Sequence, residues 1–470
     1  MGVDFSGFLL IQKKALPIKT DTLNLTEGPI VRGLIEYSIP ILLSNLFQQL
    51  YNSIDVAVLG RFAGPTPLGA VGVAGSLINL LIGFFLGIAT GASVLYAMHY
   101  GAGDKPGLKK LIDAAMLLSA VCGLLISVVG MVFSEDLLRW MGTPEELLPD
   151  AVLYLQIIFA GTLATMFYNV GAGMIRAEGD SRRPLLYLVI GGVSNLVLDV
   201  LMVAVLHWGA AGAAIATVAA QAISAVLVVL RLTKLDPAYR LDLLHPDFHG
   251  LALWDVVRIS IPCGLQGSMY NISNLLVQTS INSFGAVAVA GVTTYYKLDA
   301  FIYMPMGALS LAISTYVGQN IGAGKFGRVK WGIRFGVWAG ALSSLAVGLC
   351  IVLFARPLLS LFTTDEATCQ VSLGVMPFLA PFGWTLGFSD VLGGAIRGAG
   401  QAGKVTLITA LCICVFRIAW IFTMLPIFGD IRVIYLCYPL SWMLSSLVMT
   451  IFYFKGSVIG KTIRSAAETV

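Results

Sequence analysis

Charged residues are scarce in this chain. Asp, Glu, Lys and Arg make up only 11% of its 470 residues, whereas soluble domains contain about 25%. There are only four histidines, and none of the seven cysteines has the spacing of a zinc site. The composition therefore excludes a water-soluble fold of this length, and we expect the scattered cysteines to serve as small apolar packing residues.

Long apolar runs are abundant instead. Hydrophobic residues make up 57% of the chain, and runs of about twenty residues, each long enough to cross a bilayer as a helix, recur from end to end. The runs are continuous rather than alternating, which argues against a membrane β-barrel. We therefore predict an all-α membrane protein with twelve transmembrane helices within residues 33–59, 68–98, 111–133, 151–175, 184–206, 210–231, 252–283, 288–317, 332–354, 370–396, 404–426 and 432–454.

Lys and Arg residues fall very unevenly between these spans. One side of the predicted membrane holds nearly all of them, and the other holds only Arg61, Arg139, Arg356 and Arg432. By the positive-inside rule the basic side is cytoplasmic, which places both termini in the cytoplasm. The net charge of +4 is thereby explained by topology, and we expect no nucleic-acid partner. Residues 1–29 are polar and show no cleavable signal peptide.

The chain is duplicated. Ser38-Ile39-Pro40 recurs as Ser260-Ile261-Pro262, 222 residues later (260 − 38), and the sequence Gly-Ala-Gly at 101–103 recurs at 322–324. Parallel repeats of this kind are typical of transporters. The predicted organisation is a polar tail, an N-terminal six-helix lobe, a cytoplasmic linker, a C-terminal six-helix lobe and a second tail, at residues 1–29, 30–231, 232–251, 252–456 and 457–470.

Four stretches resemble the multidrug and toxic compound extrusion (MATE) family. They are YSIPILLSNLFQQLYNSIDVAVLGRFAG at 37–64, GAGD at 101–104, IRAEGDSRRP at 175–184 and IRGAGQAGK at 396–404. The resemblance covers roughly residues 27–456. It implies a V-shaped fold of two six-helix lobes in a bacterial inner membrane. It also implies export of organic, often cationic compounds driven by inward movement of Na⁺ or H⁺, and no enzymatic activity.

Polar residues within the apolar spans are candidates for the coupling site. An ionised Asp at mid-membrane costs roughly 2.5–3.5 kcal/mol and usually marks a function. Asn195 and Asp199 are four residues apart and share one helix face. Asp199 lies about 22 Å from the start of its span. Asp55 ends a similar stripe in the first span, which also contains Asn45, Gln48 and Asn52.

The resemblance extends to a cation site of the DinF-type branch, which maps onto Asp55, Asn195, Asp199 and Thr217. Tyr154 and Asn169 match polar residues that line the same lobe. The NorM-type branch instead has a Glu on its seventh helix, whereas the membrane interior of span 252–283 offers uncharged residues. Oxygen ligands suit Na⁺, and burial beside a second carboxylate favours a protonated acid. Either ion therefore fits, and we expect no other cofactor.

The repeat indicates which lobe holds the coupling ion. At the equivalent positions the second half has Val277, Phe416 and Trp420 in place of Asp55, Asn195 and Asp199. A residue needed only for helix packing would be expected in both copies, so we place the site in the N-terminal lobe. An alternative stays open for Asn195 and Thr217, because intramembrane Asn and Thr often join helices with bonds worth about 0.6 kcal/mol.

The second half carries its own intramembrane charges, at Lys297, Asp299, Asp390 and Arg417. We predict that these two acids and two bases form a structural charge network, with substrate contact as the alternative. Lys297 and Asp299 are two residues apart and cannot share a helix face. Residues that are candidates to line a substrate cavity are Gln48, Asn52, Tyr154, Asn169, Asn274, Gln278, Lys297 and Asp299.

Two other functions compete with drug export. A related flippase for lipid-linked saccharides would need several basic residues in its cavity, and the first half offers none. An intramembrane enzyme or receptor is less compatible, because no HExxH or similar motif is present. The Gly-rich loops lack a following Lys-Ser/Thr, so we expect no ATP. The expected partners are the lipid bilayer and small organic substrates, and we expect a monomer.

Overall fold

The computed structural model describes residues 22–242 and 250–455. Within these ranges every regular element is a helix, as predicted for an all-α membrane protein. The predicted first tail is therefore described only from residue 22, and the predicted linker 232–251 is described except for residues 243–249. The predicted tail at 457–470 lies outside the described residues.

Seven α-helices and one π-helix make up the described part of the first half, residues 22–242. Asp104 caps one of them by accepting a hydrogen bond from the backbone N–H of Gly107 at 3.0 Å. Gly161 interrupts another, where the two helices on either side meet at 46°; the apolar pattern did not predict this break. The elements are α2 (Ile30–Phe62), α3 (Pro65–Ala102), α4 (Lys105–Trp140), α5 (Leu148–Ala160), α6 (Thr162–Ala177), α7 (Arg182–Asp199), the π-helix η1 (Val200–Val205) and α8 (Gly209–Thr233).

The second half repeats this pattern with more interruptions. It contains one 3-10 helix, η2, and one π-helix, η3. The elements are α9 (Gly250–Asn282), α10 (Ala286–Gly322), α11 (Phe326–Leu353), α12 (Ala355–Leu359), α13 (Glu366–Leu379), η2 (Ala380–Phe382), α14 (Gly383–Gly398), α15 (Ala402–Thr409), η3 (Ala410–Val415), α16 (Phe416–Phe428) and α17 (Arg432–Lys455).

The described residues contain ten helices that are long and apolar enough to cross a membrane, and eleven if the bent pair α5–α6 is one span. The remaining predicted span corresponds to α9. This helix has 33 residues, which exceeds the roughly 20 needed to span a bilayer. It is not among the helices that are also apolar enough, and polar residues recur along it. The count of twelve therefore stays a prediction.

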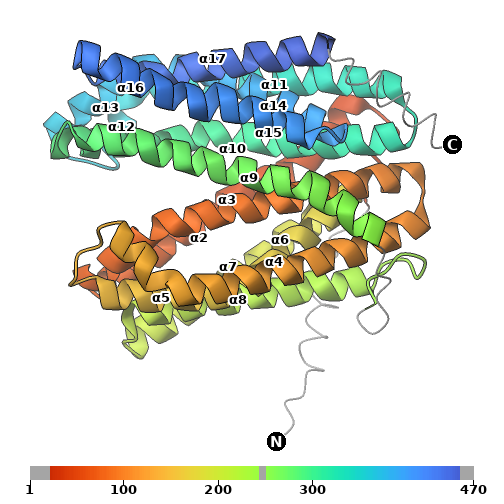
Figure 1. Cartoon of the computed structure of the whole chain (residues 1–470), viewed down its shortest axis with the longest axis horizontal. Helices are drawn as coiled ribbons and strands as arrows, with labels where there is room; N and C mark the ends of the chain where they lie inside the picture. The colour runs from red at the N-terminus through yellow and green to blue at the C-terminus, as the bar shows by residue number, and fades with distance from the viewer. Residues whose placement is uncertain (1–21, 243–249, 456–470) are drawn as a thin grey trace, which may run out of the picture.

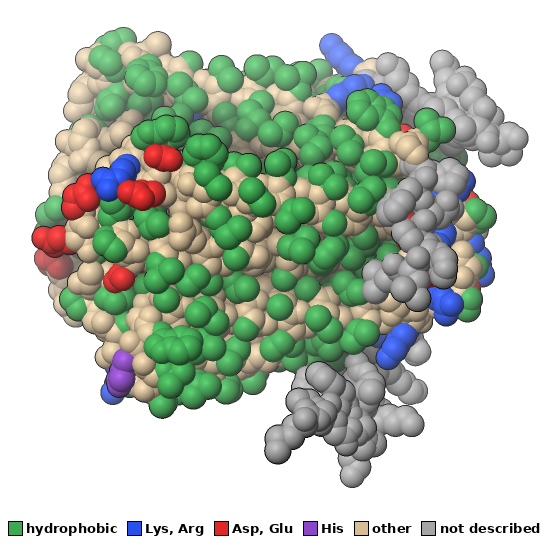
Figure 2. Space-filling view, turned by 60° about the horizontal axis from the view of Figure 1, so that its bottom comes forward, with side chains coloured by type: hydrophobic (Ala, Val, Ile, Leu, Met, Phe, Trp, Pro, Cys, Tyr) green, Lys and Arg blue, Asp and Glu red, His purple; other side chains and the backbone are tan. Residues whose placement is uncertain are grey.

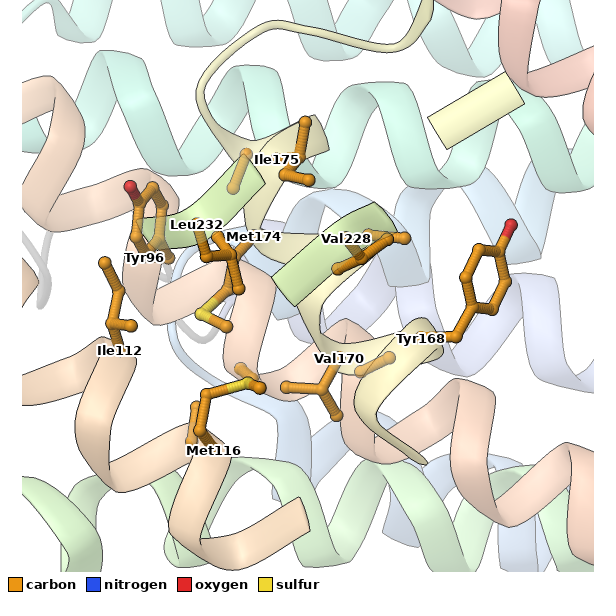
Figure 3. Close-up of a cluster of buried hydrophobic side chains, with 14 of the residues drawn as sticks. Tyr96, Ile112, Met116, Tyr168, Val170, Met174, Ile175, Val228 and Leu232 are labelled. Atoms are coloured by element: carbon orange, nitrogen blue, oxygen red, sulfur yellow. The ribbon is translucent and has the colours of Figure 1, made fainter. Parts of the chain in front are cut away.

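The helices form two packed groups. In Figure 1, α3–α8 lie in the lower part of the view and most of α9–α17 in the upper part, whereas α2 begins among the upper helices and runs into the lower part; α3 and α9 lie where the groups meet. Buried side chains from α3, α4, α6 and α8 form one core of the first group (Figure 3). Its labelled members are Tyr96, Ile112, Met116, Tyr168, Val170, Met174, Ile175, Val228 and Leu232.

Charge separates the two ends of the helices. Figure 2 shows acidic side chains gathered at one end, most Lys and Arg side chains at the other, and hydrophobic side chains covering the surface between them. We call the first the acidic end; it includes Glu135, Glu145, Asp365, Glu366 and Asp430. We call the second the basic end; it includes Lys105, Arg183, Lys325, Arg328 and Lys404. A hydrophobic band between two polar ends is the surface that a bilayer requires.

The two helix groups approach most closely between α3 and α9. A Cβ at Gly87 would collide with the backbone of Cys263, and a Cβ at Gly91 would collide with the backbone of Ser260. Small residues let helix backbones come this close in membranes. The contacts lie in the half of each helix nearer the basic end, and toward the acidic end the ribbons of α2 and α9 diverge (Figure 1). The two groups are therefore held together at the basic end.

The segment before α2 adds to this closure, although the sequence pattern indicated only a polar tail. The backbone N–H of Leu23 donates to the carbonyl of Gly179 in the first group at 3.3 Å. On the second group, Asn320 donates to the carbonyl of Leu25 at 3.2 Å, and Arg328 donates to the carbonyls of Leu25, Glu27 and Gly28. We call residues 23–28 the N-terminal bridge because they bind both groups.

Candidate functional site

Four predicted site residues come from three neighbouring helices. Asp55 lies near the acidic end of α2, Asn195 and Asp199 lie on the last two turns of α7, and Thr217 lies on α8. Asp199 is the last α-helical residue before the π-helix η1. Segments of π-helix are rare and occur frequently at functional sites. The apolar pattern of this span did not predict the change of helix type.

The two carboxyl groups face each other. Asp55 and Asp199 lie close enough for a direct hydrogen bond once one of them is protonated. The side chain of Asp199 is 0% exposed and that of Asn195 is 1% exposed. No salt bridge among the described residues includes either acid. Neither acid is therefore paired with a basic side chain in the described part of the protein.

Several polar atoms of this group have no hydrogen-bond partner among the described residues. They are one oxygen of Asp55, both oxygens of Asp199, and the oxygen and nitrogen of the Asn195 amide. Buried polar atoms in folded proteins are nearly always paired, and an unpaired one costs about 1–3 kcal/mol. So many unpaired atoms at one point indicate a site for something that supplies the missing interactions, such as a proton or a cation.

A small cavity lies beside Asn195, and neither Asp55 nor Asp199 is among the residues that line it. It has a volume of about 10 Å³ and is lined by Asn195, Thr217, Tyr51, Gln221 and Ser224, among others. That is close to the smallest volume that holds one water molecule. The Thr217 hydroxyl donates to the carbonyl of Ala213 at 2.9 Å, which leaves its oxygen free to accept or to coordinate. The structure thus brings Asn195 and Thr217 to one water-sized space.

Two further residues belong to this environment and were missed from the sequence. Tyr51 interacts with the side chains of Gln48 and Gln221. The carboxamide oxygen of Gln221 is buried and has no hydrogen-bond partner among the described residues. The sequence spacing does contain a signal for both Tyr51 and Gln221. Tyr51 is four residues before Asp55, and Gln221 is four after Thr217, so each shares a helix face with a predicted site residue.

The other first-half candidates lie at different distances from the acids. Tyr154 on α5 is buried and lies close enough to interact with both Asp55 and Asp199. Asn169 donates to the carbonyl of Thr165 on its own helix α6 at 2.8 Å and is not brought to the acids. Asn52 is exposed on α2. These contacts place Tyr154 with the acids, whereas the hydrogen bond of Asn169 stays within α6 and Asn52 is exposed.

The second-half charges do not pair as predicted. No salt bridge in the described part of the chain joins any two of Lys297, Asp299, Asp390 and Arg417; Asp390 lies 3.8 Å from Arg397 instead. As expected from their spacing, the side chains of Lys297 and Asp299 point in different directions. The exposed Lys297 ammonium lies 5.7 Å from the ring centre of Phe362, whereas buried Asp299 accepts a hydrogen bond from a tyrosine of its own helix.

The remaining two candidates are both on α9. Asn274 accepts a hydrogen bond from Arg417 at 3.0 Å, and Gln278 donates to Asn282 at 3.0 Å. Asn274 and Asp299 line a cavity in the second helix group, together with Arg417. Gln278 and Lys297 are not among the residues that line it. Asp299, Asp390 and Arg417 therefore line a cavity that is separate from the acid pair, and Lys297 does not.

The profile of the MatE family matches residues 40–201 and 262–423. These two stretches are 222 residues apart (262 − 40), which is the offset at which Ser-Ile-Pro recurs (260 − 38) and one residue more than that of Gly-Ala-Gly (322 − 101). The chain belongs to the MatE family. It is therefore a membrane transporter rather than an enzyme, and its apolar helices and bacterial relatives identify it as a multi-pass protein of a bacterial plasma membrane.

Individual relatives agree with this assignment. The probable multidrug resistance protein YoeA of Bacillus subtilis is 26% identical over 459 residues, which cover 95% of this chain and 96% of that protein. The DNA damage-inducible protein F of Escherichia coli is 27% identical over 301 residues, which cover 62% and 64%. An outward-facing multidrug resistance MATE family transporter is 24% identical, with a TM-score of 0.85 over 96% of this chain and 99% of the other. These relatives do not favour a flippase.

Proposed function

We propose that this MatE protein is a secondary active antiporter that exports organic, often cationic compounds in exchange for H⁺ or Na⁺. The observation that carries the coupling is the facing pair of half-buried Asp55 and buried Asp199, neither of which forms a salt bridge with a base in the described chain. The names of the relatives as multidrug resistance proteins support the export of drugs. We further propose that the protein acts as a monomer without ATP or a resident cofactor.

We infer the membrane topology from the distribution of Lys and Arg between the two ends of the helices. We take α9 as a membrane crossing, which gives twelve crossings, and we place the basic end and both termini in the cytoplasm. The helix groups are closed at the basic end by the α3–α9 contacts, so the described conformation opens outward. Asp55 is seven residues from the end of α2 at Phe62, or about 10 Å from the acidic end, and external ions reach it from there.

The transport cycle uses the acid pair as its switch. When both carboxylates are charged they repel each other, and this charge disfavours close packing of α2 against α7. A proton allows them to share a hydrogen bond, whereas Na⁺ takes oxygen ligands from Asp55, Asn195, Asp199 and Thr217. Either ion removes the repulsion and changes how α2 packs, which releases the exported compound. The two helix groups then reorient and the ion leaves to the cytoplasm.

A vesicle assay tests this proposal. The purified chain is reconstituted, and ethidium transport is measured under a pure Na⁺ gradient and then under a pure pH gradient. We expect one gradient to drive transport and Asp199→Asn to abolish it, because the amide cannot release or exchange the ion. Asp136→Asn, an exposed acid at the acidic end, serves as the matched control. Unchanged gradient-driven transport by Asp199→Asn would remove Asp199 from the mechanism.

A further inference from the structure

Another cavity lies at the basic end, between the starts of α9 and α15. Its volume is about 470 Å³, within the range of roughly 300–1,000 Å³ that is usual for small-molecule sites. Asp255 and Arg258 of α9 and Lys404 of α15 line it, together with Leu95 of α3. The cavity is separate from the acid pair, because Asp55 lies near the other end of the helices.

Two bases and one acid line this cavity, and no salt bridge in the described chain includes any of them. Lys404 donates to the Gln401 side chain at 3.2 Å, and its ammonium lies 5.0 Å from the ring centre of Phe452. Asp255 and Arg258 are exposed, and their side chains form no hydrogen bond among the described residues. The three charged groups are therefore available to a ligand.

Arg258 stands in a stripe of exposed apolar side chains on α9. Leu251, Trp254, Leu265 and Ile272 are all exposed. They lie seven and four residues before Arg258 and seven and fourteen residues after it (258 − 251, 258 − 254, 265 − 258 and 272 − 258), which places them on its helix face. Exposed apolar residues of a membrane helix face the acyl chains, and Trp is enriched at the level of the lipid headgroups. Arg258 is thus a positive charge near the basic end of a lipid-facing stripe.

Lys404 begins a second stripe of the same kind. Leu407, Leu411 and Val415 are exposed and follow Lys404 at steps of three, four and four residues along α15 and η3. Residues at such steps share a helix face. Each of the two helices that border the cavity therefore has a base at the basic end and exposed apolar residues beyond it.

The two stripes flank one groove. α9 and α15 pack together next to the cavity, where the Thr406 hydroxyl donates to the carbonyl of Pro262 at 2.8 Å. A molecule that lies in this groove meets charged groups at one end and apolar surface along the rest of its length. A phospholipid is divided in the same way, and basic pockets between membrane helices on the cytoplasmic side bind lipid headgroups.

The charges of the cavity favour one kind of headgroup. Arginine and lysine form charge-assisted hydrogen bonds with phosphate, and a carboxylate forms them with a protonated amine. A headgroup with both a phosphate and a primary amine therefore offers a partner to Arg258, Lys404 and Asp255 together. A headgroup with a phosphate alone offers nothing to Asp255.

We propose that this cavity binds a phospholipid whose headgroup carries a phosphate and a primary amine, as in phosphatidylethanolamine. Arg258 and Lys404 bind the phosphate, Asp255 binds the amine, and the acyl chains lie along the two apolar stripes. With the basic end in the cytoplasm, the lipid belongs to the cytoplasmic leaflet. The ligand is a component of the membrane and not an exported compound, so the site does not depend on which ion drives transport.

A lipid titration tests the headgroup. Dioleoyl phosphatidylethanolamine or dioleoyl phosphatidylglycerol is added to the purified full chain in detergent, and the bound lipid is measured by native mass spectrometry. Both lipids have the same acyl chains and a phosphate, but only the first has an amine. We expect phosphatidylethanolamine to bind about fivefold more tightly, because one contact with a charged side chain is lost without the amine. Equal binding of the two lipids would overturn the proposal.

Charge-removing variants assign the contacts. Arg258→Gln and Lys404→Gln should each weaken both lipids about fivefold, because both lipids have a phosphate. Asp255→Asn should weaken phosphatidylethanolamine alone and abolish the preference for it. Arg334→Gln, an exposed base beside Trp331, and Asp236→Asn, an exposed acid, are matched controls outside the cavity. Equal losses in these controls would show a general effect of surface charge and overturn the site.

A competition experiment identifies the source of the phosphate. Glycerophosphoethanolamine has the same headgroup without acyl chains, and we expect it not to displace the lipid at equal concentration. Displacement at equal concentration would mean that the cavity takes soluble phosphate esters, which would overturn the lipid assignment. Each variant is compared with the parent chain for both lipids in one preparation, so a partly unfolded sample, which would lose both lipids alike, is distinguished from the selective loss expected of Asp255→Asn.

Discussion

At the scale of single residues, Asp55 is a half-buried acid and Asp199 a buried one, and neither forms a salt bridge with a base among the described residues. A purely structural acid in a membrane normally pairs with a base or with backbone groups, but the oxygens of Asp199 have no partner in the described chain. The neighbouring Asn195 amide is equally unpaired. The arrangement is therefore better explained as a site that binds and releases an ion than as a permanent structural contact.

If Asp55 and Asp199 act as one unit, the losses of transport caused by replacing each acid should not multiply in the double variant. We expect Asp55→Asn and Asp199→Asn each to reduce gradient-driven ethidium transport to near background, and the double variant to be no worse than either single variant within about twofold. The measurement is the transport rate of all three variants in the same vesicles. Partial losses that multiply in the double variant would show two independent sites instead.

Residue spacing predicted part of this site. The i, i+4 relation of Asn195 and Asp199 placed them on one helix face, and the structure has them on successive turns of α7. That Asp55 meets Asp199 follows from the packing of α2 against α7, which the spacing within either helix does not encode. The predicted pairing of the second-half charges failed for the same reason, because Arg397 comes from outside the set considered.

At the scale of elements, the apolar runs located the helices well because a bilayer demands about twenty apolar residues per crossing. They did not indicate the break at Gly161 or the π-helix after Asp199, because both change hydrogen bonding without changing hydropathy. The contact of α3 with α9 also escaped the sequence pattern. There, glycine matters because the backbone of one helix occupies the space that a side chain of the other would fill.

Replacing Gly87 tests the contact between α3 and α9. A methyl group at Gly87 collides with the backbone of Cys263, and overpacking of this kind costs about 1–3 kcal/mol, so Gly87→Ala should favour separation of the helices at the basic end. We expect buried Cys263 to react roughly tenfold faster with a maleimide, since 1.4 kcal/mol corresponds to tenfold. The measurement uses a chain whose other six cysteines are replaced by alanine.

Gly72→Ala is the matched control for this change. It lies on the same helix α3, and a Cβ there meets nothing within 4 Å. Equal labelling rates in Gly87→Ala and the parent chain would show that the α3–α9 contact does not hold the basic end closed.

At the scale of the whole molecule, duplication produced two helix groups with different charges. The first holds two facing acids, and the second holds Arg417 and Asp299 across a larger cavity. Ion exchange and ligand binding can therefore reside in different groups. In the described chain they are linked where α3 packs against α9, from the basic end as far as Asn79 and Asn271, and the N-terminal bridge spans the junction at the basic end.

Arg328 is the residue through which the N-terminal bridge can be loosened without altering either cavity. It donates to the carbonyls of Leu25, Glu27 and Gly28 and to the Asn320 side chain. Hydrogen bonds to a charged donor contribute about 1.5–3 kcal/mol each in favourable cases, so Arg328→Ala should weaken closure at the basic end. We expect the maleimide labelling of Cys263 to rise as in Gly87→Ala. Lys330→Ala, an exposed base two residues away, should leave the labelling unchanged. Faster labelling in both variants would mean that basic charge at this end, rather than the bonds to residues 23–28, holds the two groups together.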